Sequence, residues 1–286
     1  MKILNKTTLA IAVAVGSISS ANAAAIIYES FSQTTGDLNG KASSGIGLTG
    51  NWSDAGTVTV EGQDLVYGDL SNTGNQATLI SSGSTQAFVT TSSALGDAGL
   101  LDDGGTLWFS YIYTAAIDGG SNEKSGFAFG TERLAPDFSG TLDLANSGNA
   151  VGLVTSSTAL TAATWNGTDP TTGGSIGFDP GDIVFVVGRI DWGATGADNE
   201  TITLYNPSLT DLGTLGTSVS HTLTAVNQTL FDTVSMAQRN SGGDQTYDEI
   251  RFGATYADVS PIQVPEPSTT ALIGLGGLAL ILRRRK

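Results

Sequence analysis

Short apolar or alternating runs recur along most of the chain, separated by clusters of glycine, aspartate, asparagine and serine. Such runs are typical of β-strands, and no segment keeps a helical period for three turns. Residues 106–117 place a leucine, a phenylalanine and two tyrosines on one face, and residues 183–187 read Ile-Val-Phe-Val-Val, as expected for a strand covered on both sides. The predicted strands cover residues 25–31, 57–61, 65–70, 86–90, 106–117, 126–130, 150–155, 182–192, 201–206, 217–225, 229–236 and 247–256.

A dozen short strands in residues 24–261, without a repeat of propeller or solenoid period and without a long linker, predict one all-β domain. The expected architecture is a two-sheet antiparallel jelly-roll sandwich. Residues 166–177 are predicted to be a loop, because their composition is Asn-Gly-Thr-Asp-Pro-Thr-Thr-Gly-Gly-Ser-Ile-Gly. The chain has no cysteine, which excludes a disulfide framework and thiol chemistry.

Residues 1–23 have the layout of a secretory signal peptide. A short segment with two lysines is followed by an apolar stretch and by the small-x-small sequence Ala21-Asn22-Ala23. Cleavage is expected before Ala24, which would make the Sec export machinery a partner of the chain. The alternative, a buried N-terminal helix, lacks a cap at its end.

Residues 262–286 combine a proline-rich turn, an uncharged apolar run and a basic end. The uncharged run, residues 268–282, would span roughly 22 Å as a helix, less than the ~30 Å hydrocarbon core of a bilayer. The basic end favours the cytoplasmic side of the membrane. The turn consists of Val264, Pro265, Glu266 and Pro267, and the basic end consists of Arg283, Arg284, Arg285 and Lys286.

This order of features resembles a PEP-CTERM sorting signal. The resemblance implies recognition by an exosortase, a membrane protease of Gram-negative bacteria, with the chain passing through the inner membrane as an intermediate before it reaches the cell surface or the extracellular matrix. A plain C-terminal membrane anchor is the alternative.

Charge is distributed unevenly along the chain. Six of the 12 basic residues lie in the two terminal segments, whereas all 27 acidic residues lie in residues 24–267, which leaves that part with a net charge of −21. Nucleic-acid binding is thereby excluded, because it depends on basic side chains that neutralise phosphates. Such a charge favours solubility and attracts divalent cations outside the cell.

Three segments resemble concanavalin A-like, LamG-type jelly rolls. The first is Tyr-Glu-Ser-Phe at residues 28–31, followed by Asn-Gly at 39–40 and Gly-Asn-Trp at 50–52. The others are residues 182–192 followed by 201–207, and the Tyr-Asp-Glu-Ile-Arg-Phe-Gly segment at 247–253. The resemblance implies two curved antiparallel sheets, adjacent N- and C-terminal strands, and a concave face that often binds sugar in this fold.

Catalytic patterns are missing from the sequence. No Glu-x-Asp-x-x-Glu or Glu-x-x-x-Glu pair of the kind that retaining glycosidases use occurs. Asp248 and Glu249 are neighbours, so a regular strand would point them to opposite faces, and one of them is expected to pair with Arg251 at the sheet surface. His221, the single histidine, is expected to face solvent, and no Gly-x-Ser-x-Gly elbow accompanies it. We therefore predict no enzyme activity.

Binding residues are indicated more weakly. Asp97, Asp102 and Asp103 lie in one turn and offer oxygen ligands for calcium, although aspartate is also a common turn residue. Trp52 and Trp165 lie beside Gly/Asn-rich segments and are the candidates for stacking on a sugar ring. The other two tryptophans lie in strong strands and are expected in the core.

These features predict an exported protein of the cell surface or extracellular matrix that is sorted by exosortase and binds polysaccharide through its jelly roll. Two alternatives remain open. One is an acidic structural matrix protein without a specific ligand, and the other is a glycan-degrading enzyme.

Overall fold

The computed structural model describes residues 24–70, 72–80, 83–116, 124–136, 142–156, 158–194, 200–208, 211–239 and 243–260. The predicted signal peptide, ending at Ala23, and the predicted sorting signal lie outside these residues. No helix in the described part has the length and apolar character needed to cross a membrane.

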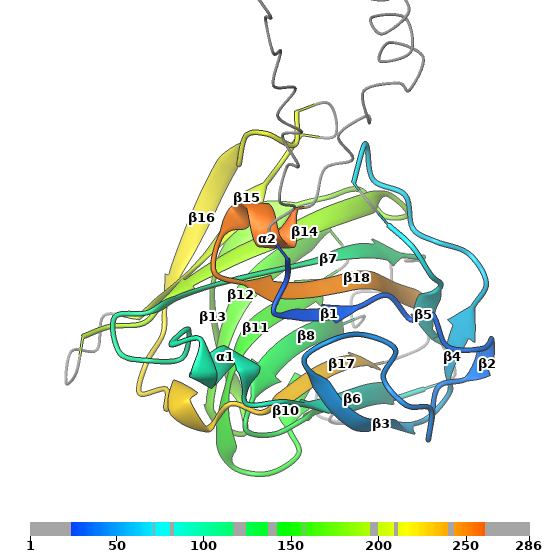
Figure 1. The fold of residues 1–286 in the computed structure, drawn as a ribbon, viewed down its shortest axis with the longest axis horizontal. Coiled ribbons are helices and arrows are strands. Elements are labelled where there is room, and N and C mark those ends of the chain that lie inside the picture. Colours follow the sequence, from blue (N-terminus) through cyan, green and yellow to red (C-terminus); the bar gives the residue numbers. More distant parts are fainter. Residues whose placement is uncertain are drawn as a thin grey trace, which may run out of the picture.

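The larger sheet has nine antiparallel strands in the order β16-β15-β14-β7-β18-β5-β4-β2, and β1 pairs with β18 off this path. Figure 1 shows β1 lying along β18, so the first and last strands are adjacent, as predicted. The strands are β1 (Ile27–Glu29), β2 (Gly36–Asp37), β4 (Val58–Glu61), β5 (Gln76–Leu79), β7 (Thr106–Ala115), β14 (Ile183–Asp191), β15 (Thr201–Asn206), β16 (Thr217–Thr222) and β18 (Gln245–Gly253).

The second sheet has seven antiparallel strands in the order β13-β12-β11-β8-β17-β6-β3. A two-stranded sheet, β9 with β10, lies against it. The strands are β3 (Leu48–Ala55), β6 (Thr85–Thr91), β8 (Lys124–Gly130), β9 (Leu134–Pro136), β10 (Leu142–Leu144), β11 (Gly148–Ser156), β12 (Ala159–Gly167), β13 (Pro170–Gly177) and β17 (Thr233–Arg239). The short helices are α1 (Ala94–Asp97), η1 (Gln228–Leu230) and α2 (Tyr256–Val259).

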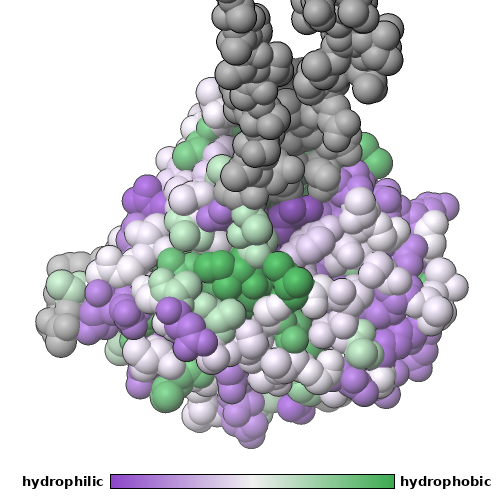
Figure 2. Space-filling model, in the orientation of Figure 1, coloured by the Kyte–Doolittle hydropathy of each residue, from purple (hydrophilic) through white to green (hydrophobic). Residues whose placement is uncertain are grey.

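The main core lies between the two sheets and follows the period of two along the strands. In β7 the odd-numbered positions from 107 to 115 join this core, whereas Trp108 and Ile112 face the other way into a second cluster. The predicted two-sided burial of β14 is confirmed, since Val186 joins the main core and Phe185 joins the second cluster. On the face in Figure 2, residues of near-neutral hydropathy and hydrophilic residues cover most of the surface, and hydrophobic ones gather near the centre.

Both sheets carry an additional layer outside the sandwich. Over the nine-stranded sheet lie α2, residues 211–215 and a strap, which we define as residues 62–73, all described except residue 71. The β9–β10 hairpin covers part of the seven-stranded sheet. These layers explain why the central strands are buried on both faces.

The predicted all-β antiparallel sandwich is confirmed, but several local predictions are wrong. Residues 170–177, predicted to be a loop, form edge strand β13, because β12 supplies its backbone partners. Residues 65–70, predicted to be a strand, belong to the strap. Residues 228–230 form η1, so the strand expected from 229 begins at Thr233. The sequence pattern does not predict strands β2, β3, β5, β9, β10 and β12.

Candidate functional site

The two tryptophans predicted to stack on a ligand are enclosed, with 0% of each residue exposed. Trp52 lies between the sheets, with its ring centroid 5.5 Å from that of Phe31, and its Nε1 donates to Glu29 Oε2 at 3.2 Å. Trp165 lies under the β9–β10 hairpin, where its Nε1 donates to the carbonyl of Leu142 at 2.8 Å. No sugar can reach either ring face, so this prediction is wrong. The remaining tryptophans are buried, as expected.

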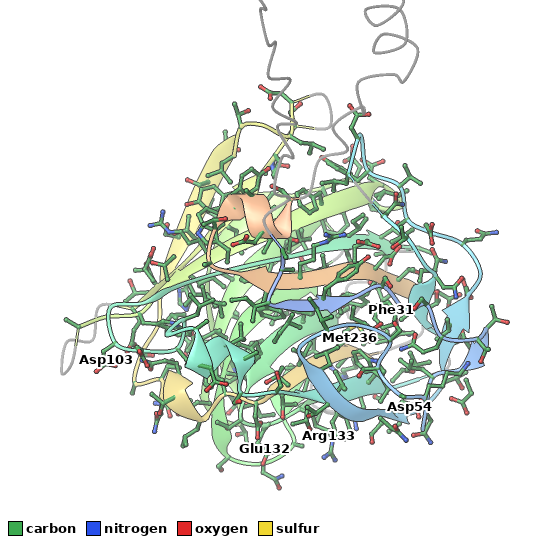
Figure 3. The ribbon with its side chains drawn as sticks, in the orientation of Figure 1. Phe31, Asp54, Asp103, Glu132, Arg133 and Met236 are labelled. Atoms are coloured by element: carbon green, nitrogen blue, oxygen red, sulfur yellow. The ribbon has the colours of Figure 1, made fainter. Side chains whose placement is uncertain are left out.

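The aspartates predicted to hold calcium do not converge on one point. Asp97 Oδ2 accepts a hydrogen bond from Ser93 Oγ at 2.8 Å, and Asp103 Oδ1 accepts one from Gln228 Nε2 at 3.0 Å. Figure 3 shows Asp103 at the periphery of the molecule. Within the described ranges, no three histidine, cysteine, aspartate or glutamate side chains gather as metal ligands. Asp97, Asp102 and Asp103 therefore do not form the predicted calcium site.

The outer face of the seven-stranded sheet is covered where a ligand would meet its centre. Leu134 and Leu142 of the hairpin pack on small residues of the sheet. A Cβ on Gly126 would lie 2.9 Å from Leu142 Cδ1 and 3.3 Å from Leu134 Cδ1. The amide of Leu134 donates to Ser235 Oγ at 3.1 Å, which fixes the hairpin by a polar contact as well. Sugar binding at this central position is blocked.

A cleft of about 510 Å³ opens where the chain crosses from β13 to β14. Its apolar lining residues are the aromatic Tyr67 and Phe178 and the aliphatic Ile183 and Val184, while carboxylate and amide groups supply hydrogen-bond acceptors. This volume is within the range typical of small-molecule sites, about 300–1,000 Å³. The lining residues are Tyr67, Thr158, Gly177, Phe178, Asp179, Asp182, Ile183, Val184 and Asn206.

A tight turn holds the acidic side of the cleft. The amide of Asp182 donates to the carbonyl of Asp179 at 3.0 Å, and the amide of Gly181 donates to the carbonyl of Ala115 at 2.9 Å. Gly181 has φ +84°, a left-handed conformation that glycine adopts without steric cost. The Asp-Pro-Gly-Asp sequence therefore anchors the turn to β7 and leaves both carboxylates exposed at the cleft.

Tyr67 brings the strap into the cleft wall. Its hydroxyl donates to the carbonyl of Pro207 at 3.0 Å, and its ring centroid lies 5.8 Å from that of Phe185 on β14. Burial raises the pKa of Tyr67, so the phenol stays neutral and remains a donor. The position of this wall depends on the docking of the strap, because none of the strands lies within the strap's described residues.

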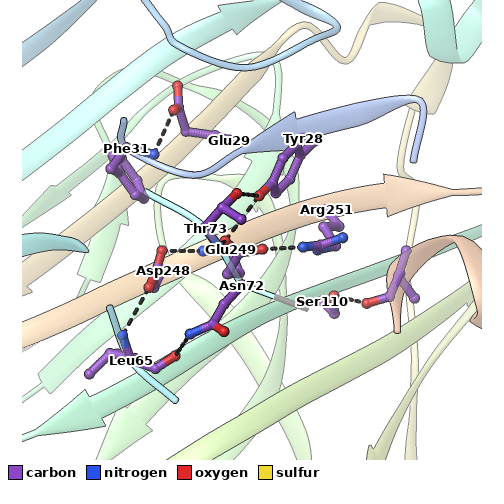
Figure 4. Close-up of polar contacts among 11 residues, drawn as sticks. Tyr28, Glu29, Phe31, Leu65, Asn72, Thr73, Ser110, Asp248, Glu249 and Arg251 are labelled. Atoms are coloured by element: carbon purple, nitrogen blue, oxygen red, sulfur yellow. Dashed lines mark hydrogen bonds and ion pairs between the residues drawn. The ribbon is translucent and has the colours of Figure 1, made fainter. Parts of the chain in front are cut away.

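Asp248 and Glu249 dock the strap from β18 (Figure 4). Asp248 Oδ2 accepts a hydrogen bond from the amide of Leu65 at 3.0 Å, and Glu249 Oε1 accepts one from the amide of Thr73 at 2.9 Å. Glu249 also pairs with Arg251, as predicted, but the side chains are only 3% and 11% exposed, so the pair is buried rather than at the surface.

The two acidic neighbours reach the same strap because β18 is irregular at this point. Its register against β7 shifts between Asp248 and Arg251, and Glu249 has φ +55°. A bulge of this kind adds a residue and redirects side chains. The prediction that Asp248 and Glu249 point to opposite faces is therefore wrong.

Burial dominates the electrostatics of this pair. It raises the pKa of Asp248 to about 8, with a further contribution from the Glu249 carboxylate, against the opposing effect of hydrogen bonds from the amides of Leu65 and Glu249. It also raises the pKa of Glu249, although Arg251 and the amide of Thr73 counteract it. The sequence identified these residues, but only as a surface pair.

His221 does not simply face solvent. It is half-buried against β13, where a Cβ on Gly173 would lie 2.7 Å from its Nδ1, and its Nε2 is buried without a hydrogen-bond partner. Burial lowers its pKa. The histidine thus packs where the edge strands of the two sheets meet.

Sequence reasoning missed Tyr67 and Phe178, because each lies outside a strand and is brought to the cleft by tertiary contacts. Asp179 and Asp182 carried a usable signal, since the Asp-Pro-Gly-Asp turn joins two strands directly.

Comparison with known proteins places a short motif at the end of the chain. A family model of the PEP-CTERM protein-sorting motif matches residues 263–286. No curated protein matches the chain in sequence.

Solved structures resemble the fold at low sequence identity. The binding domain of botulinum neurotoxin DC, in complex with SialylT, has a TM-score of 0.50 and 11% identity, covering 83% of this chain and 50% of that one. A carbohydrate esterase from the Shiga toxin-encoding bacteriophage phi24B has a TM-score of 0.44 and 14% identity, covering 80% and 97%. The PL-14 alginate lyase from Aplysia kurodai has a TM-score of 0.48 and 6% identity, covering 71% and 89%.

The chain spans about half the length of the toxin domain, and this likeness supports the fold alone. The predicted sorting motif is confirmed: the chain carries a PEP-CTERM protein-sorting motif, which indicates an exported protein that exosortase processes.

Proposed function

We propose that the exported protein binds neutral polysaccharide through the cleft beside Tyr67, at the surface or in the extracellular matrix of a Gram-negative bacterium. Sec-dependent export and removal of residues 1–23 belong to the same proposal. The sorting motif supports the route, and the ligand class is argued from the cleft, because a fold alone does not determine function.

The composition of the cleft is the observation that carries this proposal. Sugar rings present apolar faces and hydroxyl edges, so they are recognised by aromatic rings together with hydrogen-bonding groups. Tyr67 and Phe178 supply the rings, and Asp179, Asp182 and Asn206 supply acceptors for sugar hydroxyls.

Charge favours a neutral ligand. None of the lining residues is basic, and two of them are aspartates. Residues 24–267 carry six basic against 27 acidic residues, so an anionic polysaccharide would meet repulsion from the whole body as well as from the cleft. We propose binding without catalysis, since the sequence offers no catalytic carboxylate pair or triad.

Affinity electrophoresis of the purified protein in gels with neutral or uronate polysaccharide tests the proposal. Tyr67→Ala should weaken retardation in neutral polysaccharide at least tenfold, because it removes one aromatic wall. Tyr205→Ala is a matched control, since Tyr205 packs in the same hydrophobic cluster as Tyr67 but stacks on Trp108, with ring centroids 5.5 Å apart, outside the cleft.

Absence of retardation in every polysaccharide would refute the proposal and favour an acidic structural matrix protein. Release of sugar products would favour a glycan-degrading enzyme instead. The route has a separate test, intact-mass analysis of the exported protein: if residues beyond Pro267 remain, the plain membrane anchor is correct and exosortase processing is refuted.

A further inference from the structure

The strap is held to the sheet at both of its ends by one short stretch of β18. Leu65 near its start binds Asp248, and Thr73 at its end binds Glu249. Within the strap, Asn72 Nδ2 donates to the carbonyl of Leu65 at 3.1 Å and ties the two ends together. Residues 66–70, which include Tyr67, lie between these fixed points. The two carboxyl groups therefore help to position this cleft wall, together with the contacts of Tyr67 to Pro207 and Phe185.

Glu249 makes further polar contacts with Tyr28 and Arg251. The hydroxyl of Tyr28 donates to Glu249 Oε1 at 3.0 Å and lies 3.2 Å from Thr73 Oγ1. The guanidinium of Arg251 sits 4.3 Å from the centre of the Tyr28 ring while it pairs with Glu249. Glu249 thus has a compensating charge, whereas the hydrogen-bond donors of Asp248 are backbone amides.

Asp248 is the less compensated of the two carboxyl groups. Only 1% of the residue is exposed. Glu249 on its own strand and Asp64 on the strap add negative charge around it, while β7 places the uncharged Ile112 opposite it. Docking of the strap contributes to the burial of this carboxyl, since the amide of Leu65 bonds to it directly.

We propose that Asp248 and Glu249 form a proton-linked latch that holds the strap, and with it Tyr67, so that rising pH loosens one wall of the cleft. The latch stands on contacts within the protein. Its effect on ligand binding rests on the proposed function.

The direction of the effect follows from the two states of the strap. In the docked state burial raises the pKa of Asp248 to about 8 and also raises that of Glu249. In a lifted strap both groups meet water, and their pKa values return toward the ordinary range of about 4. The docked state therefore binds more protons. Between about pH 4 and pH 8 each pH unit favours lifting by up to about tenfold per proton, and above pH 8 the effect levels off.

Amide hydrogen exchange of the full chain between pH 5 and pH 9, followed on peptides that cover the strap, tests the latch. After correction for intrinsic exchange, strap opening should increase at least tenfold from pH 5 to pH 8 and then level off. Asp248→Asn should remove most of this increase. Asp191→Asn is the matched control, because Asp191 pairs with Arg189 in a half-exposed position outside the strap, and it should keep the wild-type profile.

Constant strap protection in the wild type, or a wild-type pH profile in Asp248→Asn, would overturn the latch. If Asp248→Asn fails to fold, Glu249→Gln and direct carbon-13 titration of the Asp248 carboxyl in the unmodified protein replace it, and a midpoint near 4 would overturn the proposal.

Retardation by neutral polysaccharide, measured over the same pH range, tests the consequence at the cleft. Binding that weakens toward pH 8 in the wild type but not in Asp248→Asn supports it, whereas pH-independent binding overturns it. Absence of binding at every pH refutes the proposed function, while the exchange experiment still decides on the latch.

Discussion

Removal of the buried Glu29 carboxylate should lower the free energy of unfolding more than almost any single substitution of an exposed residue. Glu29 has no exposed surface. Its oxygens accept hydrogen bonds from the amide of Phe31 at 2.8 Å, from the amide of Ser44 at 3.1 Å and from Trp52 Nε1 at 3.2 Å, and the Ser44 hydroxyl also donates to it. Glu29→Ala would leave the Phe31 amide and the Trp52 indole N–H buried without an acceptor, and the partly buried hydrogen bonds from Ser44 would be lost as well.

The size of the effect follows from those donors. A buried donor that loses its partner costs about 1–3 kcal/mol, and neighbouring losses are not additive. We expect Glu29→Ala to lower the free energy of unfolding by about 3–5 kcal/mol, because two buried and two partly buried hydrogen bonds to the same carboxylate are lost. For a domain of this size the melting temperature should fall by roughly 10 °C, since each kcal/mol shifts it by about 2–4 °C. Glu29→Gln keeps one acceptor oxygen and should cost less.

Urea unfolding followed by tryptophan fluorescence measures this change. Asp97→Ala is the control, because Asp97 is exposed and bonds only to Ser93 among the contacts described, and it should stay within about 0.5 kcal/mol of the wild type. A Glu29→Ala protein within 1 kcal/mol of the wild type would refute the reasoning.

Three further changes should have smaller, separable effects. Gly188→Ala should destabilise by about 1–3 kcal/mol or more, because the new Cβ would lie 2.1 Å from Phe109 Cζ. Trp165→Phe should cost about 1–3 kcal/mol in urea unfolding, since the buried carbonyl of Leu142 loses its donor. His221 should lower the stability of the wild type relative to His221→Gln as pH falls below about 6.5, because its depressed pKa means that the unfolded chain takes up the proton first.

Each of these has its own contradicting outcome. Gly96→Ala, where a Cβ meets nothing within 4 Å, is the control for Gly188→Ala, and equal stability of the two variants would contradict the packing argument. If amide hydrogen exchange of the β9–β10 hairpin is the same in Trp165→Phe as in the wild type, the indole does not hold the hairpin. A stability difference between wild type and His221→Gln that does not vary from pH 8 to pH 5 would contradict the histidine linkage.

The sandwich could be predicted because the local sequence pattern of its most strongly buried strands indicates their burial. Successive side chains of a strand point to opposite faces, so the sequence pattern indicates which faces are buried. The alternation in β7 and the uninterrupted apolar run in β14 indicate such burial. The number and spacing of such segments then leave few architectures for a chain of this size.

The local failures arise where distant partners decide the structure. Residues 170–177 look like a loop by composition, but β12 offers nine residues of antiparallel backbone and β16 packs beside them, so the segment becomes a strand. Trp52 and Trp165 have glycine and asparagine neighbours, yet what covers a tryptophan is set by segments far away in sequence. The residues next to a tryptophan in sequence therefore do not indicate whether another segment covers it.

The acidic pair shows a different limit. Opposite faces for Asp248 and Glu249 follow from a regular strand, and a single bulge reverses that conclusion. The left-handed backbone at Glu249 has no glycine to signal it, so sequence reasoning had no means of detecting it. The two residues could be identified from the sequence, whereas their burial and their contacts with the strap could not be predicted from it.

The location of the proposed binding site follows from what the extra layers of the two sheets cover. Small residues on the outer face of the seven-stranded sheet, Gly126, Ala128 and Ala237, leave space above the sheet. The leucines of the β9–β10 hairpin fill that space. A ligand there would have to displace a packed apolar layer and free the carbonyl bound by Trp165. The strap on the other sheet, in contrast, contributes Tyr67 to an open cleft and is fixed by ionisable groups. The hairpin is thus fixed mainly by apolar packing, whereas the strap combines apolar packing with the proposed proton-linked latch, which places the proposed regulated site beside the strap.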